Sequence, residues 1–203
     1  MKKLYSILLL IFCFSLSLAQ AQQESESPKF EIIAHGGIGY VKVRTEVQPR
    51  YNLNVNSGEI LLNYKAWKKI GIASGIGFSD VNGNGFNQTG VFYQERNLIK
   101  IPVLLTLNQD VSEKLFLFGN FGPYAQTITK DQIEYENLGE IDVFEGWNFG
   151  LQLGLGFGYN IVSNMGAGII CNGQSDFSDF ETNAGKTFND EQKHKNLNSI
   201  GVF

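Results

Sequence analysis

The chain has 203 residues, of which 20 are acidic, 16 are basic and two are histidine, so its formal net charge is −4. This length fits a single domain. The acidic balance argues against nucleic acid as a partner, and the sequence shows no basic run that would mark a patch for binding a membrane surface.

The N-terminal segment has the three parts of a secretory signal peptide. Two lysines precede a short apolar run, and the sequence AQA at positions 19–21 supplies a small-residue cleavage site. We therefore predict export, with residues 1–21 removed as the signal peptide. Residues 22–29 are polar and are predicted to be a flexible periplasmic leader. Residues 30–203 are predicted to form one β-barrel domain.

Eight segments beyond the leader have the composition of β-strands. The first, residues 30–47, changes the phase of its apolar alternation near Tyr40, which predicts a β-bulge. Residues 48–58 and 81–90 are rich in Asn and Gly and are predicted to be mainly loops. The other strands are expected at residues 59–65, 70–80, 91–107, 115–129, 147–159, 165–174 and 195–203.

Residues 147–159, WNFGLQLGLGFGY, alternate strictly between bulky apolar side chains and small or polar ones. This period of two indicates a strand with two distinct faces. Large apolar groups facing lipid and small or polar groups facing a lumen would explain both faces. Thirteen residues tilted by roughly 40° rise about 33 Å, which is enough to cross a bilayer. Trp147 and Tyr159 would then lie at the two membrane–water interfaces.

The connections between the predicted strands alternate in length. Short turns at residues 66–69, 108–114 and 160–164 separate longer polar connections, as in a transmembrane barrel. The sequence therefore predicts an all-β protein, an eight-stranded antiparallel transmembrane β-barrel with short periplasmic turns and longer extracellular loops, located in a Gram-negative outer membrane.

The alternative is a soluble exported barrel of the lipocalin type, in which the large apolar faces would line a ligand cavity. The two interpretations predict opposite directions for the side chains of Phe149, Leu151, Leu153 and Leu155.

Four segments resemble strands of the PorT-like family of small outer-membrane β-barrels from Bacteroidetes-type bacteria. They are NLIKIPVLLTLN, LFLFGNFGPYAQTI, NFGLQLGLGFGYNI and NLNSIGVF, which begin at positions 97, 115, 148 and 196. The resemblance implies an eight-stranded barrel and a possible role in protein secretion. The final Phe203 is similar to the C-terminal aromatic residue that the barrel-assembly machinery reads in such proteins.

One charged residue stands in the apolar centre of a predicted strand. Lys100 is out of phase with its apolar neighbours, and a cation facing lipid would be costly. We expect it to face the lumen and to pair there with Glu31, Glu59 or Glu95.

No catalytic, cofactor-binding or metal-binding residue is predicted. Residues 80–85, DVNGNG, open like a calcium loop, but Val91 stands where that loop needs a bidentate Glu, so a hairpin loop is favoured. His35 and His194 have no evident Ser partner for a catalytic triad. Cys171 is expected to be a small apolar residue that is buried or faces lipid.

An eight-stranded barrel has an interior just wide enough for side chains to fill. The residues expected to obstruct it are Leu98, Lys100, Leu104, Asn148 and Gln152. We therefore predict a porin-like structural or surface-binding barrel that is not a general diffusion pore. The alternatives are a component of a secretion or transport assembly and, less favoured, a lipid-modifying enzyme.

The expected partners follow from this location. They are outer-membrane lipid, the barrel-assembly machinery through Phe203, and a secretion-complex or surface partner. That last partner would bind the acidic loops at residues 131–144 and 175–193.

Overall fold

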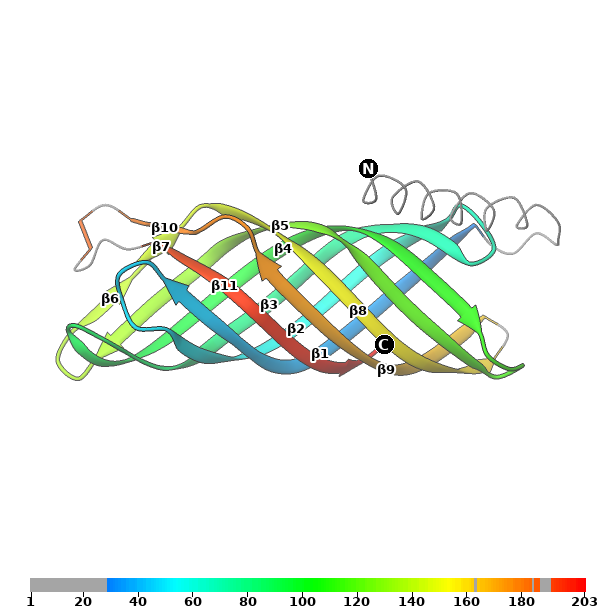
Figure 1. Ribbon diagram of the computed structural model, residues 1–203, viewed down its shortest axis with the longest axis horizontal. Helices are drawn as coiled ribbons and strands as arrows, with labels where there is room; N and C mark the ends of the chain where they lie inside the picture. Colours follow the sequence, from blue (N-terminus) through cyan, green and yellow to red (C-terminus); the bar gives the residue numbers. More distant parts are fainter. Residues whose placement is uncertain (1–28, 163, 184, 187–190) are drawn as a thin grey trace, which may run out of the picture.

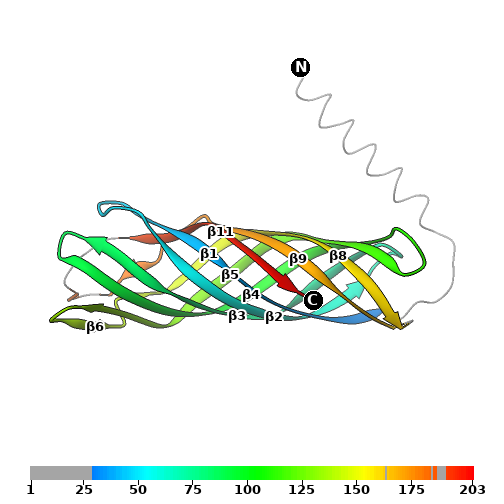
Figure 2. The same ribbon diagram turned by 90° about the horizontal axis from the view of Figure 1, so that it is seen from below.

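The computed structural model describes residues 29–203 except 163, 184 and 187–190, so the predicted signal peptide and nearly all of the predicted leader lie outside the described part. Eight long strands make up the barrel (Figures 1 and 2). They are β1 (Phe30–Thr45), β2 (Tyr51–Lys65), β3 (Ile70–Asn87), β4 (Gly90–Asp110), β5 (Leu115–Tyr135), β8 (Trp147–Val162), β9 (Met165–Asp176) and β11 (Gln192–Val202).

The barrel is closed and antiparallel throughout. Its strands follow the order β1-β2-β3-β4-β5-β8-β9-β11, and pairing of β11 with β1 completes the cylinder. Three short strands lie outside this ring: β6 (Gly139–Ile141) extends the sheet from β5, while β7 (Phe144–Glu145) and β10 (Glu181–Thr182) pair with each other. The predicted eight-stranded antiparallel barrel is confirmed.

The two ends of the barrel differ. Four-residue turns at 66–69 and 111–114 lie at one end, and β6, β7 and β10 gather at the other (Figure 1). The prediction of long loops at that second end is only partly right. β3 and β4 are joined by just Gln88 and Thr89, and β2 begins at Tyr51 rather than at residue 59. Much of the sequence expected in loops instead lengthens the strands.

The exterior carries an apolar band. Phe149, Leu153 and Leu155 of β8 are 55%, 50% and 64% exposed, whereas the alternate residues Gly150 and Gln152 are buried. Leu151 alternates with the same buried neighbours and so lies on the outer face with them. A lipocalin-type barrel would turn these side chains inward, so the structure contradicts that alternative.

The apolar band ends where polar side chains begin to face outward on β1 and apolar side chains begin to face inward. On β1 the outward residues up to Tyr40 are mostly apolar, and the next outward residues are Lys42 and Arg44. At that level β1 turns apolar residues inward instead, because Val41 and Val43 are fully buried. β1 therefore keeps a regular inside–outside alternation while the chemistry of its two faces switches.

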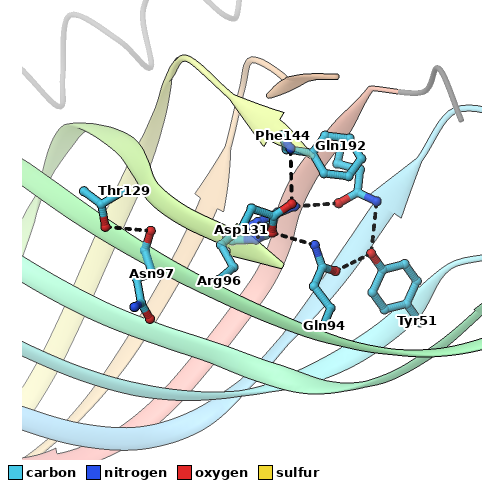
Figure 3. Close-up of polar contacts among 9 residues, drawn as sticks. Tyr51, Gln94, Arg96, Asn97, Thr129, Asp131, Phe144 and Gln192 are labelled. Carbon is cyan, nitrogen blue, oxygen red and sulfur yellow. Dashed lines mark hydrogen bonds and ion pairs between the residues drawn. The ribbon is translucent and has the colours of Figure 1, made fainter. Parts of the chain in front are cut away.

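The bulge predicted in β1 near Tyr40 is therefore assigned to the wrong strand. The register between β1 and β11 does shift there, since Tyr40 pairs with Asn198 and Lys42 with Lys195. The extra residue belongs to β11, where Asn196 has a positive φ of 51°. A second shift leaves Thr129 of β5 unpaired beside Asn97, and the Thr129 hydroxyl donates to the Asn97 carbonyl at 3.2 Å (Figure 3).

The predicted hairpin loop at residues 80–85 is also wrong, because this segment continues β3 and pairs with β4. Gly85 is required by packing rather than by a turn. A Cβ placed on Gly85 would lie 2.3 Å from the ring of Phe92, which belongs to the apolar interior cluster at this end. Glycine is needed there because the aromatic ring occupies the space of a side chain.

The small residues of β8 have the same explanation. A Cβ on Gly158 would lie 2.3 Å from the ring of Phe116, and one on Gly150 would lie 2.4 Å from the ring of Tyr124. Both aromatic residues come from the neighbouring strand β5 and point into the barrel. At these two positions the inner face of β8 is small because inward-pointing rings of β5 fill the narrow interior against it.

Candidate functional site

The interior of the barrel holds the main concentration of buried charge, and its centre is Lys100. The Lys100 ammonium forms an ion pair with the Glu59 carboxylate and donates to Gln152 Oε1 at 2.8 Å. Glu59 comes from β2, so this pair joins two strands that are not neighbours and passes over Gly77 of the intervening strand β3. Lys100 also lies 5.4 Å from the centre of the Tyr124 ring, which adds a cation–π contact.

Glu59 joins this cluster to one of the histidines. His35 Nε2 lies 2.9 Å from Glu59 Oε2, and both side chains are almost completely buried. Gln152 Nε2 donates to the same carboxylate oxygen at 3.3 Å. His35 thus helps to hold a buried carboxylate in place.

A second carboxylate, Asp176 at the end of β9, collects four donors. The Tyr124 hydroxyl donates at 2.5 Å, Asn148 Nδ2 at 2.6 Å and Gln126 Nε2 at 3.1 Å. The fourth donor is the backbone N–H of His194 at 2.8 Å. Because Asp176 is fully buried, these bonds compensate the charge that burial removes from water.

The third cluster surrounds Arg96 of β4 (Figure 3). Arg96 Nε donates to Asp131 Oδ1 at 2.8 Å, and neither side chain is exposed. Arg96 Nη2 donates to Gln192 Oε1 at 3.0 Å, and Nη1 lies 3.1 Å from His194 Nε2. Gln94 Nε2 donates to the same Asp131 oxygen at 2.8 Å. Each of the three guanidinium nitrogens therefore contacts a protein group.

This network links several strands inside one end of the barrel. The Tyr51 hydroxyl donates to Gln94 and accepts from Gln192, which ties β2 to β4 and β11 (Figure 3). The Phe144 ring of β7 lies 5.0 Å from the Arg96 guanidinium, and the Phe180 ring beside β10 lies at 5.5 Å. The backbone N–H of Phe144 also donates to Asp131 at 3.2 Å. Arg96 and Asp131 thus hold in place the two segments that extend the barrel wall at this end, residues 136–146 and 177–183, which together are called the cap.

The predicted interior residues lie where the sequence placed them. The five residues expected to obstruct the lumen are all buried: Leu98, Lys100, Leu104, Asn148 and Gln152. Of the three candidate partners for Lys100, Glu59 forms the ion pair. The other two candidates pair elsewhere. Glu31 lies 3.5 Å from Lys65, and Glu95 accepts from Lys130 at 2.7 Å.

Sequence reasoning missed the Arg96 and Asp176 clusters. Arg96 is in phase with Leu98 and Lys100 on the inner face of β4, so the argument that found Lys100 applies to it as well. Asp131 and Asp176 were assigned to loops, and their strands continue far enough to bring both carboxylates inside. The error in strand length therefore concealed the site.

Three other residues singled out in the sequence have clear positions. His194 is buried between Arg96 and the Phe180 ring, with ring centres 5.6 Å apart. Cys171 is exposed on the outer face of β9. The Phe203 ring packs inside the barrel, 5.9 Å from the Phe116 ring and 5.2 Å from the Phe118 ring. Recognition of Phe203 by the assembly machinery stays a prediction.

In the part of the chain that the structure describes, no helix has the length and apolar character needed to cross a bilayer. Among the same residues, no three His, Cys, Asp or Glu side chains are grouped so that they could hold a metal ion.

Comparison with known proteins reveals similarity in fold but not in sequence. No model of a known protein family matches the chain, and no curated protein matches it either. The barrel is similar to the crystal structure of Neisserial surface protein A (NspA), with a TM-score of 0.52 and 10% identity over 88% of this chain and 98% of that one.

Two further solved structures align less closely. Ail, the attachment invasion locus protein of Yersinia pestis, matches with a TM-score of 0.41 and 13% identity over 86% of this chain and 97% of that one. The outer membrane protein OprG from Pseudomonas aeruginosa matches with the same TM-score and identity over 85% and 95%. The fold is that of the small eight-stranded outer-membrane β-barrels.

Proposed function

We propose that this protein is an integral outer-membrane β-barrel that acts through its surface and does not serve as a general diffusion pore. The membrane location is supported by the outward apolar band, whose aromatic ends Trp147 and Tyr159 suit the two interfaces. It is also supported by the shared fold and by the signal peptide that the sequence predicts.

The observation that carries the closed-lumen proposal is the buried pair of Arg96 and Asp131. Both side chains are fully buried inside the barrel and are joined to each other, so they obstruct the lumen at that level. The Lys100–Glu59 pair forms a second constriction closer to the other end. An interior of eight strands has no width to spare around such obstructions.

Planar-bilayer recording of the purified protein tests this proposal. We expect rare or very small openings, recorded beside a wide porin as the positive control. A stable, large and ohmic conductance from the monomer would refute the closed lumen.

A second candidate rests on the four segments that resemble PorT-like barrels. In that case the protein is a component of a secretion or transport assembly, and the cap end supplies the contacts. Exposed acidic residues at this end, such as Glu136, Asp142 and Glu181, favour a partner with a basic surface. Purification under mild detergent from native outer membranes tests this candidate. A stoichiometric partner would support it, and recovery of the barrel alone would favour the solitary barrel.

A further inference from the structure

Four cations face one another across the seam between β1 and β11. Lys42 lies opposite Lys195 and Arg44 lies opposite Lys193, all on the outer face. The sequence analysis found no basic patch because these residues come from opposite ends of the chain. Like charges directly across two strands destabilise a sheet, so this arrangement needs a compensating reason.

Nearby carboxylates offset only part of this charge. Lys193 forms an ion pair with Asp179, and Lys195 donates to a neutral group, the backbone carbonyl of Asp176, at 2.7 Å. Arg44 and Lys193 also line a hollow of about 310 Å³ together with Thr45, Glu46, Arg50 and Asp179. Positive side chains outnumber negative ones around this seam, although the protein as a whole is acidic.

The cations lie directly beyond the apolar band. The outward residues that precede Lys42 on β1 are Ile38 and Tyr40, which are 66% and 55% exposed. A cation that follows an interfacial tyrosine on the outer face of a membrane strand reaches the level of the lipid headgroups. Phosphate groups at that level are the natural counterions for exposed Lys and Arg.

An apolar groove runs below the same cations. It has a volume of about 460 Å³ and crosses the outer faces of β8, β9, β11 and β1. Its walls include Leu153 and Leu155 on one side and Ile38 and Tyr40 on the other. Gly173 lies between these walls without a side chain, and a Cβ there would meet nothing closer than Asn198 Oδ1 at 3.9 Å. The groove has the apolar character that a lipid acyl chain requires.

We propose that the β8–β9–β11–β1 face binds a phosphate-bearing lipid of the outer leaflet. Its acyl chain would lie in the groove beside Gly173, and its phosphate would contact Lys42, Arg44 and Lys195. The lipid site rests on the proposed membrane location, because a groove in contact with water would not meet such a ligand.

Native mass spectrometry of the detergent-solubilised full-length protein tests the site. The probes are phosphatidylglycerol, phosphatidylcholine with the same acyl chains, and glycerol phosphate as a headgroup without chains. We expect phosphatidylglycerol to bind at least about tenfold more tightly than phosphatidylcholine, since only the former carries a net negative charge. Equal binding of the two lipids, or equally tight binding of glycerol phosphate, would overturn the proposal.

Two variants locate the binding. The preference for phosphatidylglycerol should be lost in the triple variant Lys42→Gln/Arg44→Gln/Lys195→Gln. It should be kept in a matched triple variant at the other end of the barrel, Lys68→Gln/Lys69→Gln/Lys114→Gln. Gly173→Leu should fill the groove and weaken binding of both lipids. Its control, Gly58→Leu, adds the same side chain at another outward glycine with room for a Cβ, the nearest atom lying at 3.7 Å.

The experiments distinguish an incorrect lipid site from an incorrect membrane location. Boiled and unboiled samples of the membrane fraction should migrate differently on a detergent gel. This heat-modifiable migration checks both the location and the folding of every variant. A heat-modifiable barrel without lipid preference overturns the lipid site alone. A protein recovered without detergent from the soluble periplasm overturns both. If the triple variant does not fold, the comparison of wild type with Gly173→Leu decides.

Discussion

Arg96 and Asp131 are directly opposite each other on β4 and β5, and their side chains meet at 2.8 Å with neither exposed. The pair links the barrel wall to its cap, because Asp131 also accepts from the backbone of Phe144 and Arg96 lies against the Phe144 and Phe180 rings. One buried ion pair therefore contacts both segments of the cap from inside the barrel.

Removal of Asp131 should destabilise the barrel severely. Asp131→Ala leaves the Arg96 guanidinium buried without its counterion, a change that costs about 3–5 kcal/mol in comparable sites. Urea unfolding of the refolded protein in detergent micelles measures this loss. Lys130→Gln is the control, since Lys130 belongs to an exposed pair on the adjacent position of β5 and should change stability little. Equal stability of the two variants would contradict the assigned role of Arg96.

The Lys100–Glu59 pair should behave as a coupled unit. Lys100→Met and Glu59→Leu should each cost about 3–5 kcal/mol, because each leaves the other charge buried and unpaired. The double variant should cost clearly less than the sum, since it removes both charges together. A double-mutant cycle on unfolding free energies provides the measurement. Strict additivity would show that the two side chains do not interact.

The cap should loosen without its aromatic contact. Phe144→Ala removes the ring that lies on Arg96, so the segment between β5 and β8 should open more often. Limited proteolysis of intact cells or proteoliposomes should then cut residues 136–146 faster than in the wild type, while the barrel remains heat-modifiable. An unchanged cleavage rate would show that the cap is held by other contacts. Phe149→Ala on the outer face is the control and should leave cap cleavage unchanged.

Gly85 provides a test of the extended strand β3. Gly85→Ala should destabilise the protein by about 1–3 kcal/mol, because the new Cβ would overlap the Phe92 ring. The same change at Gly58, where the nearest atom lies at 3.7 Å, should have a much smaller effect. Thermal or urea unfolding compares the two variants. If Gly85→Ala left the stability unchanged, the result would contradict the extended strand and favour the loop that the sequence predicts for residues 80–85.

The sequence predicted the barrel because its exterior pattern is simple. The alternation at residues 147–159 requires an apolar outer face and a small inner face, and the structure has both. The outward direction of the Phe149 and Leu155 side chains could be predicted from the opposite face of the same strand, because a face rich in glycine is not a typical soluble surface.

The errors in strand length have one physical origin. Beyond the apolar band, β1, β2 and β3 continue with apolar residues inside and mostly polar residues outside, as in a soluble barrel, while β4 and β5 add the buried Arg96 and Asp131 to that interior. From sequence alone, the change between Tyr40 and Val41 predicts a bulge, and the polar stretches 48–58 and 81–90 predict mainly loops. The polarity switch accounts for these errors, and they in turn concealed the Asp131 and Asp176 clusters.

The buried partners were only partly predictable. An inward cation such as Lys100 can be recognised from its phase on one strand, but its partner depends on which strands lie near it in the closed barrel. Glu59 is two strands away from Lys100 in the ring, and sequence spacing gives no information about that distance. The basic seam of Lys42 and Lys195 was missed for the same reason, because it exists only when the barrel closes.

The central claim is that the outward face of this barrel lies in lipid, and Cys171 tests it most directly. This cysteine is exposed within the apolar band of β9 and is the only one besides Cys13. A nitroxide attached to it in a Cys13→Ser background, reconstituted in bilayers, should be relaxed strongly by oxygen and weakly by a water-soluble nickel chelate. Strong relaxation by the nickel chelate and weak relaxation by oxygen would place this face in water and contradict the membrane barrel.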